Sequence, residues 1–555
     1  MRTMKKILIV GAVLLTGFTS CRKYLDVNKD PNTATGSTAP LMMGQAITYT
    51  ASNVVSYNSY GAWMVGYTSN AGGYGGWGSA LTYDYANTSY TGLWNGAYDN
   101  MQDFQFILQE TEGKDEYAWY NGIARIMKVF HFQFLVDTYG DIPYSEALKG
   151  IGNVNPSYDK AEDIYKDLYS QLDIALETIN NAVAPLGLNH SLGNADPMFN
   201  ARANNSNINN WKRLANTLKL RLLIRASETG VFAGVTPTFD PVGFLTTDAI
   251  VNPGYGKVAG QQNPFWNAFH SSVTDAGAAR SLITTYFMLS FYNGTKMEDE
   301  ARAKAIYRGV FTPARNQTGI TDDNVPLAPT GSSVWYSGNG SSYSNSDNYD
   351  NAVGVLKGRG QGQPIFTAAE SYFLQAEGRM KGILTTGDDV ETLFNKGIEA
   401  SFLYLFRTAD GTFKTNTYFS NIFSDGVITE AKVKQAAADY HTEGDNTTNY
   451  LVNINLATTN EERLEAIITQ KYIALNMIHG HEAWAEFRRT GYPKIDNSLP
   501  FDEDLTFVST LSQATTPDRT LGRLLYPDTE YQLNTQNVPT SVTVFGSYVF
   551  WDRRN

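Results

Sequence analysis

The sequence predicts a mainly α-helical protein in which helical hairpins form the scaffold and long loops form one face. Three observations predict this fold class. Apolar residues recur three and four positions apart over several segments, which is typical of helices that bury one face. Gly, Tyr, Asn and Ser gather in long inserts between these segments. Hydrophobic residues make up 42% of the 555 residues, which is enough for a large core.

The chain begins with a segment typical of a bacterial lipoprotein signal peptide. A short basic stretch precedes an apolar run over 7–18, and this run is shorter than the ~20 residues that span a bilayer. Small residues and then Cys21, the only cysteine, follow it. A lone cysteine forms no internal disulfide, so it is free or modified. We predict that residues 1–20 are removed and that lipid on Cys21 anchors the mature chain to a membrane.

The helical segments come in pairs along the chain. In the first pair, a short polar turn separates two runs whose apolar positions follow helical spacing, which predicts a hairpin. Two further pairs and one later helix show the same spacing. Such hairpins are similar to tetratricopeptide arrays, although no strict repeat of ~34 residues is present. The predicted segments are 93–108 and 117–135, 164–179 and 211–222, 366–376 and 394–402, and 464–475.

Three inserts interrupt the helical segments, near 66–92, 251–280 and 330–352. Loops longer than ~15 residues are uncommon in compact domains unless they are functional or disordered. These inserts carry Trp and Tyr between glycines, a composition that argues against plain disorder. We expect short strand pairs within them. No clean linker divides the chain, so we predict a single domain over 21–555.

Charge and composition bound the classes of partner. The formal net charge is −12, whereas binding to nucleic acid relies on clustered Lys and Arg, so nucleic acid is not an expected partner. Aromatic residues are abundant, with 34 Tyr, 9 Trp and 28 Phe. Tyr and Trp offer a flat apolar face with a polar tip, which suits the binding of sugars or peptides in water.

Several short segments, in order along the chain, carry recognisable motifs. The most distinctive are CRKYLDVN at 21–28 and DTYGDIPYSEA at 137–147. Together these segments resemble the SusD/RagB-type lipoproteins of Bacteroidetes, and the match is closest to the SusD-like branch. The resemblance covers the mature chain from its first residue to its last. The other matching segments are 211–216, 369–377, 481–491, 523–527 and 549–552.

The resemblance implies both a fold and a function. The implied fold is a SusD-type scaffold of tetratricopeptide-like helices with an irregular face that binds the ligand. The implied protein is anchored in the outer membrane by lipid, faces the cell exterior and captures oligosaccharides or peptides. It passes them to a SusC-like TonB-dependent transporter, and it is a binding protein rather than an enzyme. Arg22 and Lys23 stand directly after Cys21, where exported surface lipoproteins often carry acidic residues.

The internal motifs predict a role in the scaffold rather than at the ligand. The segment 137–147 closes a helix with a glycine and a proline, so it predicts a corner between helices. Glu370 and Glu377 are seven residues apart and therefore share one helix face. Arg488 and Arg489 are predicted to pair with such buried carboxylates and to fasten helices together.

The predicted ligand-binding residues are aromatic side chains of the inserts that stand near amides. Aromatic faces cover the C–H surface of a sugar, and amide side chains orient its hydroxyl groups. The alternative for each is packing in the core or against the transporter. Four tryptophans at helical spacing are assigned to the core instead, namely Trp94, Trp119, Trp211 and Trp484. The candidates are Tyr67, Tyr74, Trp77 and Tyr83 in the first insert, Asn263, Trp266 and Asn267 in the second, and Trp335 and Tyr336 in the third.

Signals for catalysis or metal binding are weak. His481 lacks the second histidine four positions later that a zincin helix needs, and no Gly-x-Ser-x-Gly elbow is present. The run 345–350 has the oxygen density of a calcium loop without the spacing of an EF-hand, so we expect a solvated turn and no cofactor. Two alternatives stay open. One is a helical-repeat adaptor that binds only proteins. The other is a surface hydrolase, since a chain with 55 acidic residues could place two carboxylates at the separation that glycoside cleavage needs.

Overall fold

The computed structural model describes residues 38–182, 192–199, 208–309, 312–329, 333–338 and 349–554. The leader, Cys21 and most of the run 345–350 lie outside these residues. Over the described ranges the fold is mainly α-helical with a few very short strands, which confirms the predicted fold class. No helix in this part of the chain combines the length and the apolar character needed to cross a membrane.

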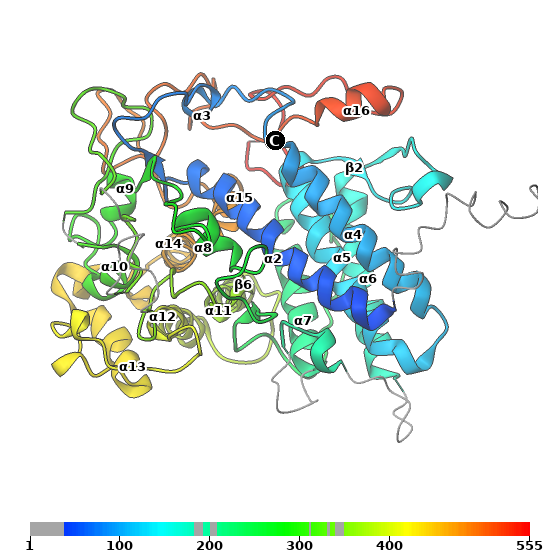
Figure 1. Ribbon diagram of the computed structural model, residues 1–555, viewed down its shortest axis with the longest axis horizontal. Helices are drawn as coiled ribbons and strands as arrows, with labels where there is room; N and C mark the ends of the chain where they lie inside the picture. The colour runs from blue at the N-terminus through cyan, green and yellow to red at the C-terminus, as the bar shows by residue number, and fades with distance from the viewer. Residues whose placement is uncertain are drawn as a thin grey trace, which may run out of the picture.

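Long helices that pack side by side build the N-terminal half of the described chain. In α4 the buried residues Trp94, Met101 and Phe104 recur at helical spacing, which gives this helix one apolar face. α4, α5 and α6 lie next to one another in the right half of Figure 1. α4 with α5, and α6 with α7, are the first two pairs that the sequence predicts. The helices are α2 (Ala39–Met64), α3 (Ser79–Thr82), α4 (Thr91–Thr111), α5 (Ala118–Tyr139), α6 (Ala161–Asn180) and α7 (Ile208–Arg225).

The C-terminal half contains shorter helices with well-defined starts. Thr367 and Asp389 cap two of them by accepting a backbone N–H three residues ahead, and Thr459 with Glu462 forms a capping box. The third predicted pair, α11 with α12, and the later helix α14 are confirmed. The helices are α8 (Pro264–Phe269), α9 (Tyr286–Leu289), α10 (Glu300–Ile306), α11 (Ala368–Met380), α12 (Val390–Phe406), α13 (Glu430–Asp439), α14 (Asn460–Ala474), α15 (Gly480–Thr490) and α16 (Asp528–Leu533).

The longest helix, α2, was not predicted from the sequence. Its buried residues lie all around the helix rather than along one stripe, because several elements cover it. It crosses α15 at very close range. A Cβ atom on Gly61 would lie 2.1 Å from the backbone N of His481, and one on Gly480 would lie 2.3 Å from the backbone N of Ala62. Two glycines therefore permit the central helix crossing.

Three antiparallel strand pairs fasten loops to one another, and none of the three lies within a single insert, which differs from the expectation that strand pairs form within the inserts. One pair joins the first insert to the segment after the second insert, and another joins the second insert to the start of α11. The pairs are β1 (Ser69–Asn70) with β5 (Leu282–Ile283), β2 (Ile142–Pro143) with β3 (Tyr158–Asp159), and β4 (Ala249–Val251) with β6 (Gln363–Phe366).

The segment 137–147 forms the predicted corner after α5. Gly140 has a φ of 73° and a Cβ there would lie 2.8 Å from Nη1 of Arg523, so the turn needs glycine. The carboxylate of Asp141 accepts a hydrogen bond from the backbone N–H of Ala161 at 2.9 Å, which starts α6. The motif thus links two helices of the scaffold.

One cluster of buried apolar side chains runs from Ala39 in α2 to Trp551 near the C-terminus. The tryptophans assigned to the core lie in it: three are buried, and Trp119 is half-buried against it. Loops and short helices, including α3 and α16, lie along the upper edge of Figure 1. This loop-rich edge contains the first insert. The single-domain organisation stays a prediction.

Candidate ligand-binding sites

Six of the nine predicted ligand-binding side chains are buried, which differs from the prediction that they face a ligand. In the first insert, the hydroxyl of Tyr67 donates to the backbone O of Tyr472 at 2.5 Å. The hydroxyl of Tyr83 accepts from the backbone N–H of Ser509 at 3.1 Å. These rings anchor the loop to distant segments. The six are Tyr67, Tyr83, Asn263, Trp266, Trp335 and Tyr336.

The candidates of the second insert build the start of α8. The side chain of Asn263 accepts from the backbone N–H of Trp266 at 2.9 Å and donates to the backbone O of Gln361 at 3.0 Å. Trp266 packs against the ring of His270, with centroids 3.9 Å apart. Asn267 is exposed. The buried pair thus fixes the helix and offers no surface to a ligand.

The described residues of the third insert pack in the same way. Tyr336 stacks on Tyr418 with ring centroids 4.6 Å apart, and its hydroxyl accepts from Nδ2 of Asn416 at 2.9 Å. Trp335 packs edge-on to Phe269 at 5.7 Å. Glycine-rich loops have few side chains of their own to bury, so their aromatic residues hold them to the core.

Tyr74 and Trp77, two of the three remaining candidates, form an aromatic platform with a residue of α2. Trp77 is half-buried and lies nearly parallel to Trp63, with centroids 5.4 Å apart and an interplanar angle of 14°. Its Nε1 donates to the backbone O of Tyr74 at 3.1 Å. Tyr74 is 42% exposed. We call Trp63, Tyr74 and Trp77 the aromatic platform. The sequence predicted two of its members and assigned no role to Trp63.

Neighbouring loops hold the platform loop in place. The backbone N–H of Gly72 donates to the backbone O of Pro326 at 3.0 Å, and a Cβ at Gly72 would lie 2.2 Å from the backbone O of Val325. Beyond this crossing the loop is open, since a Cβ at Gly75 or Gly76 would meet nothing within 4 Å. The rings are therefore fixed at their base and accessible at their tip.

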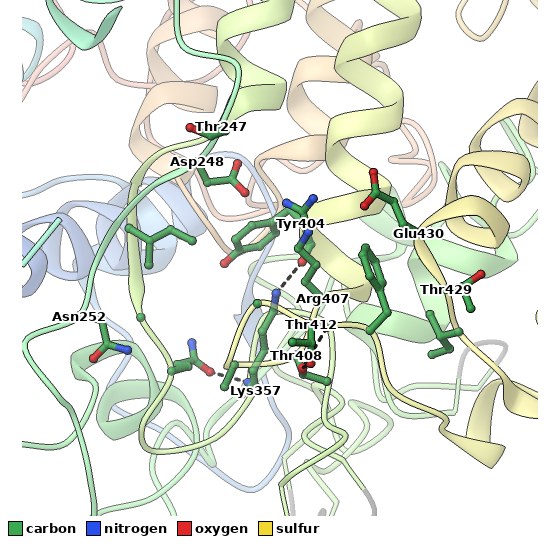
Figure 2. Close-up of a pocket in the computed structure, with 17 residues that line it drawn as sticks. Thr247, Asp248, Asn252, Lys357, Tyr404, Arg407, Thr408, Thr412, Thr429 and Glu430 are labelled. Carbon is green, nitrogen blue, oxygen red and sulfur yellow. Dashed lines mark hydrogen bonds between the residues drawn. The ribbon is translucent and has the colours of Figure 1, made fainter. Parts of the chain in front are cut away.

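A second candidate is a cleft that the sequence did not predict. It has a volume of about 610 Å³ and lies among β4, the loop before β6, the end of α12 and the start of α13 (Figure 2). We call it the polar cleft. Its residues come from four separate segments, so no local pattern marks it. The labelled lining residues are Thr247, Asp248, Asn252, Lys357, Tyr404, Arg407, Thr408, Thr412, Thr429 and Glu430.

Buried charge dominates the electrostatics of the polar cleft. Nζ of Lys357 donates to the backbone O of Tyr404 at 2.5 Å and lies 4.2 Å from the centre of its ring. Burial lowers the pKa of Lys357 to about 7, although nearby Asp248 favours the charged form. Burial likewise raises the pKa of Asp248, whose carboxylate accepts from the backbone N–H of Ala368 at 2.8 Å. Lys357 and Asp248 thus bond to the backbone of neighbouring segments and stabilise the walls of the cleft.

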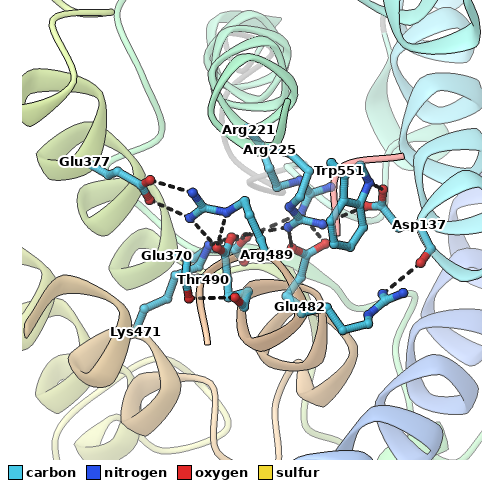
Figure 3. A network of polar contacts seen from close by, with 12 residues as sticks. Asp137, Arg221, Arg225, Glu370, Glu377, Lys471, Glu482, Arg489, Thr490 and Trp551 are labelled. Atoms are coloured by element: carbon cyan, nitrogen blue, oxygen red, sulfur yellow. Dashed lines mark hydrogen bonds and ion pairs between the residues drawn. The ribbon is translucent and has the colours of Figure 1, made fainter. Parts of the chain in front are cut away.

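A buried charge network joins α5, α7, α11, α14 and α15 (Figure 3). We define this network by its nine charged residues, namely Asp137, Arg221, Arg225, Glu370, Glu377, Lys471, Glu482, Glu486 and Arg489. Arg225 pairs with Asp137 at 2.8 Å and with Glu482 at 2.6 Å. Burial raises the pKa of Glu482, but Arg221 and Arg225 outweigh it and hold the pKa below its usual value. With these side chains buried, the network is a part of the scaffold.

The network confirms one predicted pairing and corrects another. Arg489 forms two bonds with the carboxylate of Glu377, at 2.7 and 2.8 Å, as predicted. Arg488 instead donates to the backbone O of Asp137 at 2.8 Å and of Gly522 at 2.9 Å, so it stabilises the corner after α5. Over the described ranges, no group of three or more His, Cys, Asp or Glu is placed to hold a metal ion.

Two protein-family models match the chain. One, described as starch-binding and associating with the outer membrane, matches residues 31–242. The other, described as SusD and RagB outer membrane lipoprotein, matches residues 293–549. No curated protein matches the sequence.

Solved structures show the same fold at low sequence identity. A SusD homologue from Bacteroides fragilis has a TM-score of 0.62 and 18% identity, over 90% of this chain and 95% of that chain. A SusD/RagB family protein from Bacteroides thetaiotaomicron has a TM-score of 0.61 and 17% identity, over 93% of this chain and 99% of that chain. A chitin-binding SusD homologue from Flavobacterium johnsoniae has a TM-score of 0.59 and 20% identity, over 92% of this chain and 99% of that chain.

Proposed function

Because the chain belongs to the SusD/RagB family of outer-membrane lipoproteins and is a surface nutrient-binding protein, we propose that it captures an oligosaccharide on the aromatic platform. The observation that carries this proposal is Trp77, which stays half-exposed on the loop-rich edge while six other predicted rings and amides are buried. An indole face covers the C–H surface of a sugar ring, and the exposed Tyr74 adds a hydroxyl beside it.

The platform is preorganised for binding. Trp77 stacks on Trp63, which is itself 5% exposed, and the indole N–H groups donate to backbone oxygens of the first insert, that of Trp63 to Ala80 and that of Trp77 to Tyr74. A ring that is already fixed loses little conformational entropy when a ligand settles on it. A Cβ on Gly75, Gly76 or Gly78 would meet nothing within 4 Å, so this part of the loop borders open space.

We further propose that lipid on Cys21 anchors the protein to the outer membrane, facing the cell exterior, and that captured oligosaccharide passes to a SusC-like TonB-dependent transporter. The family match and the leader of the sequence support this proposal. Capture needs no bond to be made or broken, so the protein acts as a binding protein and not as an enzyme.

Isothermal titration calorimetry of the protein with chitooligosaccharides, followed by a panel of other glycans and peptides, tests the platform. Chitooligosaccharides come first because a structural neighbour is described as chitin-binding. Trp77→Ala should weaken binding at least ~10-fold, equivalent to about 1.4 kcal/mol, and Trp77→Phe should retain part of the affinity. Trp119→Ala is the matched control, since Trp119 is also half-buried but lies on α5.

Equal affinity for Trp77→Ala and Trp119→Ala would overturn the assignment of the platform. An absence of binding across the whole panel would favour the adaptor that binds only proteins. Delivery has a separate readout, because the lipidated full chain should co-purify with a TonB-dependent barrel from the outer membrane, and recovery without any barrel would contradict it.

A further inference from the structure

The polar cleft lies away from the aromatic platform and is large enough to hold a small ligand. The helices α12 and α13, which border it, lie in the lower half of Figure 1, whereas α3 and the rest of the loop-rich edge lie at the top. The volume of the cleft, about 610 Å³, is within the ~300–1,000 Å³ typical of small-molecule sites. A ligand in this cleft is therefore separate from one on the platform.

Three side chains that line the cleft keep polar groups without a hydrogen-bond partner among the residues that the structure describes. The guanidinium of Arg407 forms no hydrogen bond or ion pair there, and it packs 5.5 Å from the centre of the Phe413 ring. Tyr404 is only 6% exposed, yet its hydroxyl forms no hydrogen bond. Asp248 accepts from the backbone N–H of Ala368 at Oδ1 and accepts no bond at Oδ2. Donors and acceptors are thus left available in one cavity.

These three side chains lie close to one another without bonding to one another. Figure 2 shows them together in the cleft. Burial raises the pKa of Asp248 and nearby Arg407 opposes this effect, while burial and the charge of Asp248 raise the pKa of Tyr404. Arg407 and Asp248 nonetheless form no direct ion pair. A hydroxyl group between them can accept from the guanidinium and donate to the carboxylate.

The charges that line the cleft favour a neutral ligand. Two are positive and two are negative, so the lining carries no net charge. Outside the lining, Lys434 lies 3.0 Å from Glu430 and is shared with Glu399 at 3.6 Å. An ionic ligand would lose its hydration here without meeting an unmatched charge. The four charged residues of the lining are Asp248, Lys357, Arg407 and Glu430.

We propose that the polar cleft is a second saccharide site, which binds a neutral sugar through Arg407, Asp248 and Tyr404. The guanidinium donates to hydroxyl groups of the sugar, the carboxylate accepts from them, and the phenol hydroxyl does either. The half-buried ring of Phe413 supplies apolar surface for the C–H groups. The site is independent of the aromatic platform and does not rest on the function proposed for it.

Calorimetry on the mature Trp77→Ala protein tests the proposal, because this background removes the platform and leaves the cleft intact. The probes are the methyl glycosides of glucose, galactose, mannose and N-acetylglucosamine. At least one should bind, and it should bind at least ~3-fold more tightly than the uronate and the 2-amino sugar of the same configuration. It should also bind more tightly than glycine, a zwitterion that offers one charge to Asp248 and the other to Arg407.

Two substitutions in this background test the cleft residues. Arg407→Gln removes charge-assisted hydrogen bonds and should weaken binding at least ~10-fold. Tyr404→Phe removes one hydroxyl and should weaken it ~3-fold. The matched controls lie outside the cleft and should bind as the background does. They are Arg463→Gln on α14, since Arg463 forms no ion pair within the described residues, and Tyr372→Phe on α11, since the Tyr372 hydroxyl forms no hydrogen bond there.

A fold control accompanies these variants. Tyr404→Phe should unfold at the same temperature as the Trp77→Ala background, because the hydroxyl that it removes bonds to no described residue. The bound glycoside should raise the unfolding temperature of the background and of both controls, and it should raise that of Arg407→Gln less.

Three results would each overturn the proposal. The first is an absence of binding by all four glycosides to the Trp77→Ala protein. The second is equal affinity within either matched pair of variants. The third is tighter binding of the uronate, the amino sugar or glycine than of the neutral glycoside, which would make the cleft a site for ions.

Discussion

The buried charge network and the aromatic platform use their side chains in opposite ways. In the network, Arg225 is fully buried and meets three carboxylates from two other helices. In the platform, Trp77 is held from one side by Trp63 and stays partly open on the other. Most residues of the network lie in the motif segments 137–147, 369–377 and 481–491, whereas Tyr74 and Trp77 of the platform lie in an insert. Exposure, rather than residue type or motif, separates the part that folds the protein from the part that can bind.

The largest expected effect is the loss of Arg225 from the network. Arg225→Ala leaves the carboxylates of Asp137, Glu482 and Glu486 without this partner, so it should cost about 5 kcal/mol of unfolding free energy, the upper end of the range for broken buried pairs. Denaturant unfolding measures this cost. Lys396→Ala is the control, because the Lys396 to Asp388 pair is nearly half-exposed on both sides and should contribute at most ~1 kcal/mol. Similar losses in both variants would contradict the distinction.

The next effect concerns a residue that the sequence assigned to the ligand and the structure buries. Trp266→Ala should lower the unfolding free energy by about 3–5 kcal/mol, because it opens a cavity beside His270 and Tyr349. It should leave glycan affinity unchanged at temperatures where the variant is folded. Trp77→Ala should show the reverse pattern. Denaturant unfolding and calorimetry on both variants give the comparison, and a weakened glycan affinity in Trp266→Ala would return this ring to the binding site.

The sequence predicted the scaffold better than the site for a physical reason. Helical hairpins depend on local spacing, so α4, α5, α11 and α12 could be read from the positions of apolar residues. The helix α2 could not, because its burial on several sides removes the periodic pattern.

Exposure of a loop aromatic depends on which distant segment covers it. Tyr67 is capped by Tyr472, which is 405 residues away, and Tyr83 by Ser509, which is 426 residues away. No local pattern carries that information, and the same limit applies to the polar cleft with its four separate segments. Trp77 stays half-exposed because no distant segment covers its part of the loop, where a Cβ on Gly75, Gly76 or Gly78 would meet no atom within 4 Å.

The smallest expected effect is a dependence on pH that the interior shows and the platform lacks. His131 is fully buried in α5, with Nε2 3.0 Å from Oγ1 of Thr50, and burial lowers its pKa from 6.5 to about 3. The folded state therefore keeps this ring neutral at a pH where the unfolded chain takes up a proton. Its contribution to stability is fully present above pH 6.5 and is lost progressively as the pH falls from 6.5 towards 3.

Between pH 6.5 and 5 this loss amounts to about 1.6 kcal/mol, and urea unfolding at the two pH values should detect it. His131→Gln should reduce the pH dependence by that amount, because glutamine takes up no proton in the unfolded chain. The platform consists of two tryptophans and a tyrosine and contains no histidine or carboxylate, so the affinity for a neutral glycan should stay constant over the same interval. An affinity that falls together with the stability would mean that the platform is not mechanically independent of the core beneath it.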